Sequence, residues 1–283
     1  MAALRVVVER KYVINNISKD LIGKGAFGSV YSAVNKNTGD NVAIKLEKNT
    51  ENALLKHESQ MYTLLNGASG IPNMRSYGIE GEYNYLVTDR LGKSLDTLLC
   101  SCGGSFSLET VINIGLRMIK CIKEVHDRGI IHRDVKPDNF LMGQGQMEGN
   151  LYIIDFGFST WFNDSGGKHL PVRHDKKMMG TPMFTSIYVE RGTLPSRRDD
   201  LESMGYILIY LLTGSLPSRG EFAPCGTFWD ACGDIPGEFI LFVSYCRSLA
   251  YDACPDYNYL RNILFNLHKL RLFHSVNNFD WCM

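Results

Sequence analysis

The sequence predicts an α+β fold with two segregated lobes, the first built mainly of strands and the second mainly of helices. Runs rich in Val, Ile and Tyr, separated by turn residues, fill residues 1–90. From Ser94 onward the apolar residues recur at helical spacing instead. The joint between the two patterns is expected in the segment TDRLGKS, residues 88–94.

One helix is expected to interrupt the strands of the first lobe. The strand segments are YVINNISKDLIGKG, GSVYSAVNKNTGDNVAIKLE and YNYLVTDRL, and the turn residues Asn37, Gly39 and Asp40 divide the second of them. The helix is expected from about Asn52 to Leu65, because apolar residues recur there at roughly helical spacing. These residues are Leu54, Leu55, Met61, Leu64 and Leu65.

The second lobe is expected to contain several helices around a central one. The segment SLETVINIGLRMIKCIKEVHDRG carries an apolar stripe, with Ser107 as its N-cap and Gly129 as its stop. The segment RRDDLESMGYILIYLLTG becomes apolar nearly all round, which is typical of a buried helix. Further helices are expected near residues 237–248 and 256–267, and the sequence contains no internal repeat.

Composition excludes several classes of protein. The 283 residues are 45% hydrophobic and 21% charged, and the net charge is zero, so nothing global favours nucleic acid or an anionic membrane as a partner. The longest apolar run, MGYILIYLL, is far shorter than a bilayer span of ~20 residues, and no secretory leader is expected. None of the eight cysteines forms a C-x-x-C pair, so a zinc ribbon is not expected, and the chain is too large for a small secreted disulfide scaffold. We therefore expect reduced thiols and a place in the cytoplasm or nucleus, and separately we expect a monomer.

A glycine-rich segment, IGKGAFGSV, fits the pattern G-x-G-x-x-G-x-V. Glycine allows backbone amides to approach phosphate oxygens closely. Dinucleotide-binding folds share the pattern, but their loop opens a helix, whereas SVYSAVN continues here as a strand. We expect a hairpin tip over phosphates, with a simple tight turn as the alternative. The residues assigned to nucleotide in this segment are Ile22, Gly23, Lys24, Gly25, Ala26, Phe27, Gly28, Ser29 and Val30.

A lysine and a glutamate are expected to pair behind this hairpin. The run VAIK ends at Lys45, where a lysine below a glycine hairpin can reach the phosphates of a nucleotide. Such a lysine needs a carboxylate to hold it in place. Glu58, in LLKHESQMY on the expected helix, is the candidate. The alternatives are a lysine whose charge simply extends to solvent and a solvated glutamate.

The segment HRDVKPDNFLMG matches the catalytic loop of protein kinases. Phosphoryl transfer depends mainly on positioning and charge. Asp134 would accept the proton of an attacking hydroxyl, and Lys136 would neutralise charge on the phosphoryl group. Asn139 would supply an oxygen ligand to Mg²⁺. The segment DFG at residues 155–157 follows in the required order, and its Asp155 would bind the same ion.

The chain resembles the casein kinase 1 family of Ser/Thr protein kinases over nearly its whole length. HRDVKPDNFLMG and SRRDDLESMGYILIYLLTGSLP are close to segments of that family, and PDYNYLR and FDWCM look like the end of its catalytic domain. The resemblance implies one protein kinase domain over residues 1–283. Its N-lobe would cover about 1–90, its hinge about 88–94 and its C-lobe about 95–283.

The resemblance also implies ATP and Mg²⁺ as cofactors and Ser/Thr-bearing proteins as substrates, with Asp200 anchoring the catalytic loop. The backbone of Asp89 and Leu91 would bind the adenine edge, and Thr88 would stand at the gate behind it. The side chains implied around the adenine are Ile22, Val30, Ala43, Leu141 and Ile154.

Two departures concern the substrate groove. Met183 in GTPMF stands where the family usually carries an anion-binding arginine, and the segment 218–237 is short, with Arg219 as its one basic residue. These changes bear on any preference for acidic or primed substrates. VRHDKK supplies Arg173, His174, Lys176 and Lys177 nearby, either as a solvated loop or as a substitute acidic-substrate patch.

Two further function classes are weighed against an active protein kinase. A catalytically impaired scaffold would share the fold, but the intact Lys45, Asp134, Asn139 and Asp155 favour the enzyme. A small-molecule kinase would share the lobes, but Lys136 and the central helix segment argue against it.

Overall fold

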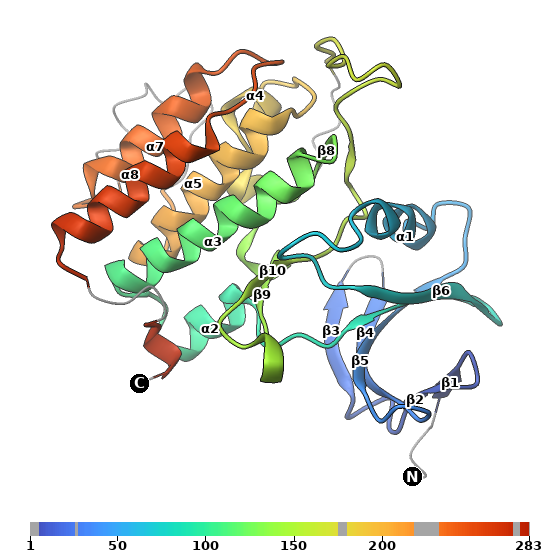
Figure 1. Cartoon of the computed structure of the whole chain (residues 1–283). Coiled ribbons are helices and arrows are strands. Elements are labelled where there is room, and N and C mark those ends of the chain that lie inside the picture. Colours follow the sequence, from blue (N-terminus) through green and yellow to red (C-terminus); the bar gives the residue numbers. More distant parts are fainter. Residues whose placement is uncertain (1–5, 26–27, 175–179, 218–231, 274–277, 283) are drawn as a thin grey trace.

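The computed structural model describes residues 6–25, 28–174, 180–217, 232–273 and 278–282. These residues form a curled lobe of strands with one helix and a larger lobe of helices, as Figure 1 shows. The α+β, two-lobed fold expected from the sequence is therefore confirmed.

The first lobe is built on an antiparallel sheet. Its strands lie in the order β1-β2-β4-β5-β7-β6, and β3 pairs with the free part of β4. Alternating side chains pack beneath the sheet around the fully buried Ile14, Ile44 and Val87. The strands are β1 Val6–Val8, β2 Tyr12–Ile14, β3 Leu21–Gly25, β4 Gly28–Asn35, β5 Asn41–Lys48, β6 Met74–Glu80 and β7 Tyr83–Asp89.

The helix of this lobe, α1 (Leu55–Leu64), begins three residues later than expected. The reason is a cap supplied from another element. The carboxylate of Glu47, on β5, accepts hydrogen bonds from the amides of Leu54 at 3.0 Å and Leu55 at 2.8 Å. Because this cap comes from the preceding strand and not from the residue before the helix, helical periodicity alone predicts the start too early.

The joint lies where the sequence predicts it. β7 ends at Asp89, and the chain then runs extended until Ser94 caps α2 (Leu95–Ser101). The joint packs on the short strand β9 (Phe140–Met142), since Gly92 donates to Met142 at 2.8 Å and Met142 donates to Lys93 at 3.0 Å. The joint is thereby attached to the segment that follows the catalytic loop.

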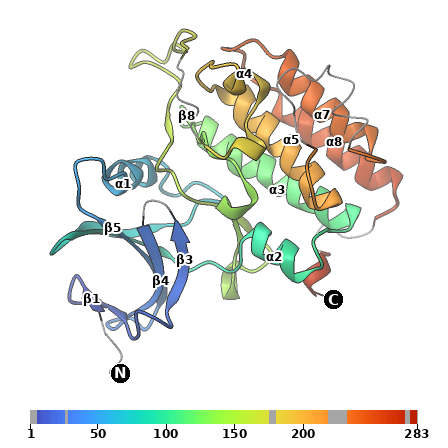
Figure 2. The same cartoon turned by 180° about the vertical axis from the view of Figure 1, so that it is seen from behind.

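The second lobe is arranged around α5 (Arg197–Thr213), which contacts both α3 (Leu108–His126) and α7 (Gly237–Ser248) (Figure 2). Ser107 caps α3 as expected, but α3 ends at His126, before the left-handed Gly129. The central helix is buried nearly all round, as its sequence predicts. The remaining elements are α4 Ile187–Glu190, α8 Tyr257–Leu270, β8 Ile130–Ile131, β10 Leu151–Ile153 and β11 Thr160–Trp161.

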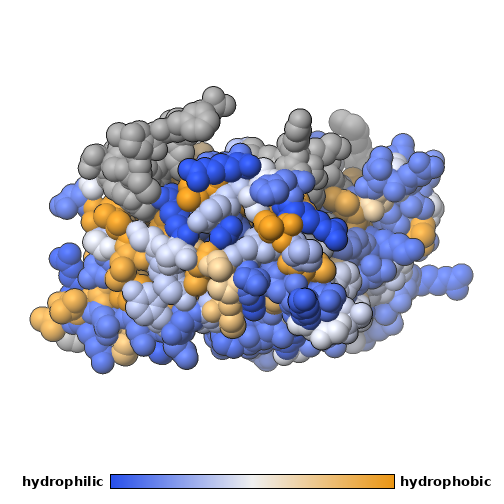
Figure 3. All heavy atoms as spheres, turned by 90° about the horizontal axis from the view of Figure 1, so that it is seen from above, coloured by the Kyte–Doolittle hydropathy of each residue, from blue (hydrophilic) through white to orange (hydrophobic). Residues whose placement is uncertain are grey.

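The surface is mixed in character. Figure 3 shows the upper face with hydrophilic residues over much of it and small groups of hydrophobic residues among them. Within the described ranges, none of the helices combines the length and apolarity needed to cross a bilayer. The seven cysteines that the structure describes carry free thiols, and Cys225 lies outside the described residues.

The contact between α5 and α7 yields a test of the fold. A Cβ on Gly205 would lie 2.4 Å from Val243 Cγ2 and 3.3 Å from Phe242 Cδ1. Overpacking costs about 1–3 kcal/mol and outweighs the gain of about 1 kcal/mol in helix propensity. We expect Gly205→Ala to lower the free energy of unfolding, measured by urea titration. Gly237→Ala is the control, because a Cβ at Gly237 meets nothing within 4 Å; an equal effect of both variants would contradict this account.

Candidate active site

The glycine-rich segment forms a hairpin between β3 and β4. Gly25 pairs with Gly28 and Gly23 with Val30 across the two antiparallel strands. A Cβ on Gly28 would lie 2.4 Å from the carbonyl oxygen of Leu46, so the close approach of β5 requires glycine there. The expected hairpin is confirmed, and a loop that opens a helix is excluded. Ala26 and Phe27, expected at the tip, lie outside the described residues.

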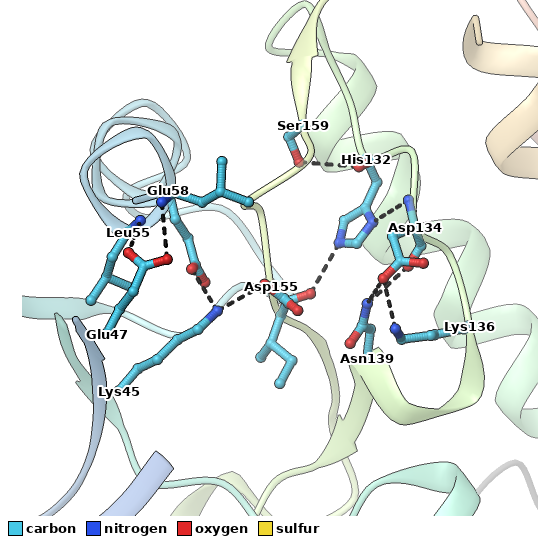
Figure 4. Close-up of polar contacts among 12 residues, drawn as sticks. Lys45, Glu47, Leu55, Glu58, His132, Asp134, Lys136, Asn139, Asp155 and Ser159 are labelled. Carbon is cyan, nitrogen blue, oxygen red and sulfur yellow. Dashed lines mark hydrogen bonds and ion pairs between the residues drawn. The ribbon is translucent and has the colours of Figure 1, made fainter. Parts of the chain in front are cut away.

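A partly buried lysine joins the two lobes. Lys45 Nζ, from β5, lies 2.7 Å from Glu58 Oε2 on α1 and 2.9 Å from Asp155 Oδ1, which follows β10 in the second lobe (Figure 4). The expected ion pair of Lys45 with Glu58 is present. Asp155 is a second partner, so one ammonium group connects a strand, a helix and a loop of the other lobe.

The charges of this triad depend on burial and on one another. Burial would lower the pKa of Lys45, but the negative charges of Glu58 and Asp155 outweigh it, so that pKa is raised. Burial would raise the pKa of Asp155, but the charge and hydrogen bond of Lys45 hold it below its ordinary value. Asp155 therefore stays ionised and retains its capacity to bind a cation. Burial dominates at Glu58, whose pKa is raised to about 7.

The segment after β8 brings three of the expected catalytic residues together. Lys136 Nζ lies 2.7 Å from Asp134 Oδ2. Asn139 Nδ2 donates to Asp134 O at 2.9 Å and to Asp134 Oδ2 at 3.2 Å. The other carboxylate oxygen, Oδ1, accepts a hydrogen bond from Thr181 Oγ1 at 2.9 Å. Sequence reasoning gave Thr181 no role at Asp134, because the two are joined only by the fold of the segment between them.

Asn139 is oriented in a way that suits a magnesium ligand. Its amide nitrogen is directed to Asp134, which leaves the amide oxygen directed away from that carboxylate (Figure 4). Asn139 and the ionised Asp155 thus provide the oxygen donors that Mg²⁺ prefers. Nowhere in the described ranges do three His, Cys, Asp or Glu side chains gather into a metal site. Two protein oxygens fit an ion that usually keeps its other positions for water and phosphate.

A buried aspartate of α5 holds the backbone of the catalytic loop. Asp200 accepts hydrogen bonds from the amides of His132 at 2.7 Å and Arg133 at 2.9 Å, and its Oδ2 lies 3.0 Å from His126 Nε2. Burial would raise its pKa, but the contact with His126 lowers it below the ordinary value. The loop is strained at Arg133, which has φ 72°. The contacts of Asp200 hold this conformation in place.

The residues implied around an adenine lie on facing strands and on the joint. Ala43 pairs with Thr88 across β5 and β7, Val30 pairs with Lys45, and Leu141 bridges to Ser94. Ile22 is 39% exposed on β3, as a side chain lining an open cleft would be. Ile154 directly precedes Asp155.

Two backbone groups of the joint are available for an adenine edge. The side chain of Asp89 is turned to Asn73 and Arg75, and its amide donates to Asn73 O at 3.1 Å. Thr88 Oγ1 makes a long contact of 3.4 Å to its carbonyl oxygen. The part of the chain that the structure describes offers no partner to the amide of Leu91. The carbonyl of Asp89 and the amide of Leu91 stand two residues apart along the chain, which is the spacing expected for contacts to an adenine edge.

Glu58 makes the stability of the protein depend on pH. Its pKa is raised from 4.5 to about 7 in the folded state. Between these values the folded state binds the proton more tightly, so the stabilisation by Glu58 is present below pH 4.5 and is lost as pH rises through about 7. Relative to Glu58→Gln, the wild type should lose at most about 3 kcal/mol over this range. Thermal unfolding of both proteins from pH 5 to pH 8 measures this loss. A wild type that became more stable relative to Glu58→Gln as pH rises would contradict the prediction.

The comparison with known families agrees with this geometry. The family model described as "Protein kinase domain" matches residues 17–224, which include the glycine hairpin, the Lys45 triad, the joint, the catalytic loop and the central helix. This match supports ATP binding and phosphotransfer to proteins. The chain belongs to the protein kinase family.

Proposed function

We propose that the protein is an active Ser/Thr protein kinase of casein kinase 1 type that uses ATP and Mg²⁺. The observation that carries the proposal is the joint presence of two arrangements. One is the triad of Lys45, Glu58 and Asp155, and the other is the set of Asp134, Lys136 and Asn139. A scaffold that only binds partners does not need both.

The residues divide the reaction between them. The glycine hairpin covers the phosphates of ATP, and Lys45 holds them with its charge while Glu58 keeps Lys45 in position. Bound Mg²⁺, held by Asn139 and Asp155, would neutralise phosphate charge. Asp134 orients the substrate hydroxyl and accepts its proton, and Lys136, 2.7 Å from Asp134, approaches the phosphoryl group being transferred.

The surroundings of Asp134 favour serine and threonine as the accepting residues. Asp134 is only 4% exposed, and its two carboxylate oxygens lie against Lys136 and Thr181. A short aliphatic hydroxyl that approached Asp134 between these two side chains would bring the substrate backbone close to the carboxylate. A phenol requires the backbone to lie several ångströms farther away. We propose that this narrow cradle selects Ser/Thr.

The casein kinase 1 assignment rests on the sequence segments that resemble that family. The charge of the preferred substrates is a separate question, because the family's anion-binding arginine is replaced here. Met183, at the position of the family's anion-binding arginine, is 52% exposed. Arg173 and His174 are exposed on the preceding segment, which is attached through Leu194, whose amide donates to Arg173 O at 2.8 Å. Lys176, Lys177 and Arg219 lie outside the described residues. We propose that the 173–177 segment replaces the lost arginine as the site for acidic substrate residues.

The activity is tested with radiolabelled ATP, Mg²⁺ and casein. We expect Asp134→Asn to reduce kcat at least a hundredfold, because the hydroxyl loses its proton acceptor, while ATP still binds. Lys36→Gln, a change at an exposed turn far from the site, is the control. ATP binding without phosphate transfer by the wild type would favour the scaffold instead.

The same assay tests the substrate class. A matched set of peptides carries Ser, Thr or Tyr at the accepting position, each with acidic or neutral flanks. We expect transfer to Ser and Thr, faster with acidic flanks, and loss of the acidic preference in Lys176→Ala/Lys177→Ala. Equal use of acidic and neutral peptides by the wild type would contradict the acidic-substrate site, and transfer to Tyr would contradict the Ser/Thr cradle.

Thr88 tests the placement of the nucleotide. It lies opposite Ala43 at the end of β7, where its small side chain should admit bulky ATP-competitive inhibitors. We expect Thr88→Met to raise the Ki of such inhibitors at least tenfold, because the longer side chain fills the space. The KM for ATP should stay within about threefold. An unchanged Ki would show that Thr88 does not line the pocket.

A further inference from the structure

Besides the proposed nucleotide cleft, a second cavity of about 560 Å³ is lined by the loop after α1, by α3 and by the turn between β9 and β10. Figure 1 shows how these elements are arranged. The residues of this cavity include Asp89 but none of the others assigned above to nucleotide, metal or catalysis. Its volume falls in the range typical of ligand sites, about 300–1,000 Å³. The reaction proposed above leaves it without a role.

The walls of this cavity are tied together across the two lobes. The carbonyl of Gly70, in the loop after α1, accepts a hydrogen bond from the amide of Ile153 on β10 at 2.9 Å. The thiol of Cys121, on α3, donates to Leu151 O at 3.2 Å. Gly70 has φ 78°, and a Cβ there would lie 2.4 Å from Cys121 Sγ, so this contact needs glycine. The cavity is therefore built into the fold.

Positive charge dominates the rim. Arg117 and Lys120 on α3 and Arg261 on α8 line the cavity. The acidic residue of the lining, Asp89, is neutralised by Arg75 at 2.7 Å. Arg117 is occupied by the carbonyls of Gly149 and Asn113.

Two of these cations remain accessible to a ligand. Lys120 is exposed, and the described part of the chain offers its ammonium group no partner. Arg261 is exposed and stacks on Phe265, 5.5 Å from the ring centroid, with no carboxylate partner among the described residues. Both charges stand beside the cavity without a compensating anion from the described chain.

Part of the inner wall is apolar, beside the polar Ser69, Asn73 and Asn150. Ala68 and Ile71 are each 6% exposed and Leu151 is 3% exposed, while the partly buried Leu116 and Met147 extend the same wall. An apolar wall with cations on its rim is complementary to a ligand that has an aliphatic group and negative charges beside it. A polypeptide segment with an aliphatic side chain between aspartates and glutamates has this chemistry.

We propose that this cavity is a docking site for an acidic segment of a partner protein, separate from the site where phosphate is transferred. One aliphatic side chain of the segment enters against Ile71 and Leu151. Flanking carboxylates pair with Lys120 and Arg261. Because the site lies outside the catalytic residues, it holds a partner without occupying the nucleotide or the accepting hydroxyl.

The test uses a fluorescein-labelled peptide of ten residues, with two leucines between runs of aspartate and glutamate and with no Ser, Thr or Tyr. Fluorescence anisotropy measures its Kd with the full chain. We expect Lys120→Glu/Arg261→Glu to weaken binding at least tenfold, and binding to weaken as salt rises from 50 to 300 mM. Lys36→Glu/Lys48→Glu, which makes the same change in net charge at exposed positions of the first lobe, should bind as the wild type does.

Further measurements separate this site from the substrate groove. Ser69→Trp, at an exposed position of the lining, should also weaken binding by filling the cavity. Lys176→Ala/Lys177→Ala should leave the Kd unchanged, and so should saturating ATP. Equal weakening by the first-lobe control, or displacement of the probe by a substrate peptide, would overturn the proposal. So would a neutral peptide, with Gln and Asn replacing the acids, that bound equally well.

Discussion

The rest of the active site depends on one shared charge, the ammonium group of Lys45. It lies 2.7 Å from Glu58 and 2.9 Å from Asp155, and these three residues belong to a strand, a helix and a loop of two different lobes. An unpaired charge at this depth is costly, so the two lobes are held in the arrangement that supplies both carboxylates. The same geometry keeps Asp155 ionised beside the place where phosphates would lie.

A second buried charge fixes the other half of the site. Asp200 accepts the amides of His132 and Arg133, and it is fixed in turn by the central helix and by His126. The loop between those amides and Asn139 presents Asp134 at a defined depth. In the proposed mechanism Lys45 would position the nucleotide, and Asp200 holds the loop whose Asp134 would act on the substrate. Lys45 and Asp200 therefore act through separate sets of contacts.

The features that could be predicted from the sequence are those set by nearby residues or by the order of known motifs. The glycine hairpin, the N-cap at Ser107 and the pairing of Lys45 with Glu58 were all accessible, because each follows from residue type, spacing and the order of motifs. The cap of α1 by Glu47, the bond of Thr181 to Asp134 and the pairing of His126 with Asp200 were not. Each joins residues between 7 and 74 positions apart by a contact that only the tertiary fold creates.

The joint carries two kinds of contact at a single residue. In the proposed nucleotide site the carbonyl of Asp89 would bind the adenine, whereas its side chain is bonded to Asn73 and Arg75 at the edge of the second cavity. Asp89 therefore links a ligand in that cavity to the proposed nucleotide site, through its side chain on one side and its backbone on the other. Equilibrium coupling requires the ligand to bind two arrangements of this unit with different affinity. The bonds of Asp89 to a loop and to a strand allow little rearrangement, so a docked segment mainly raises the local concentration of its own substrate residues, as a tether does.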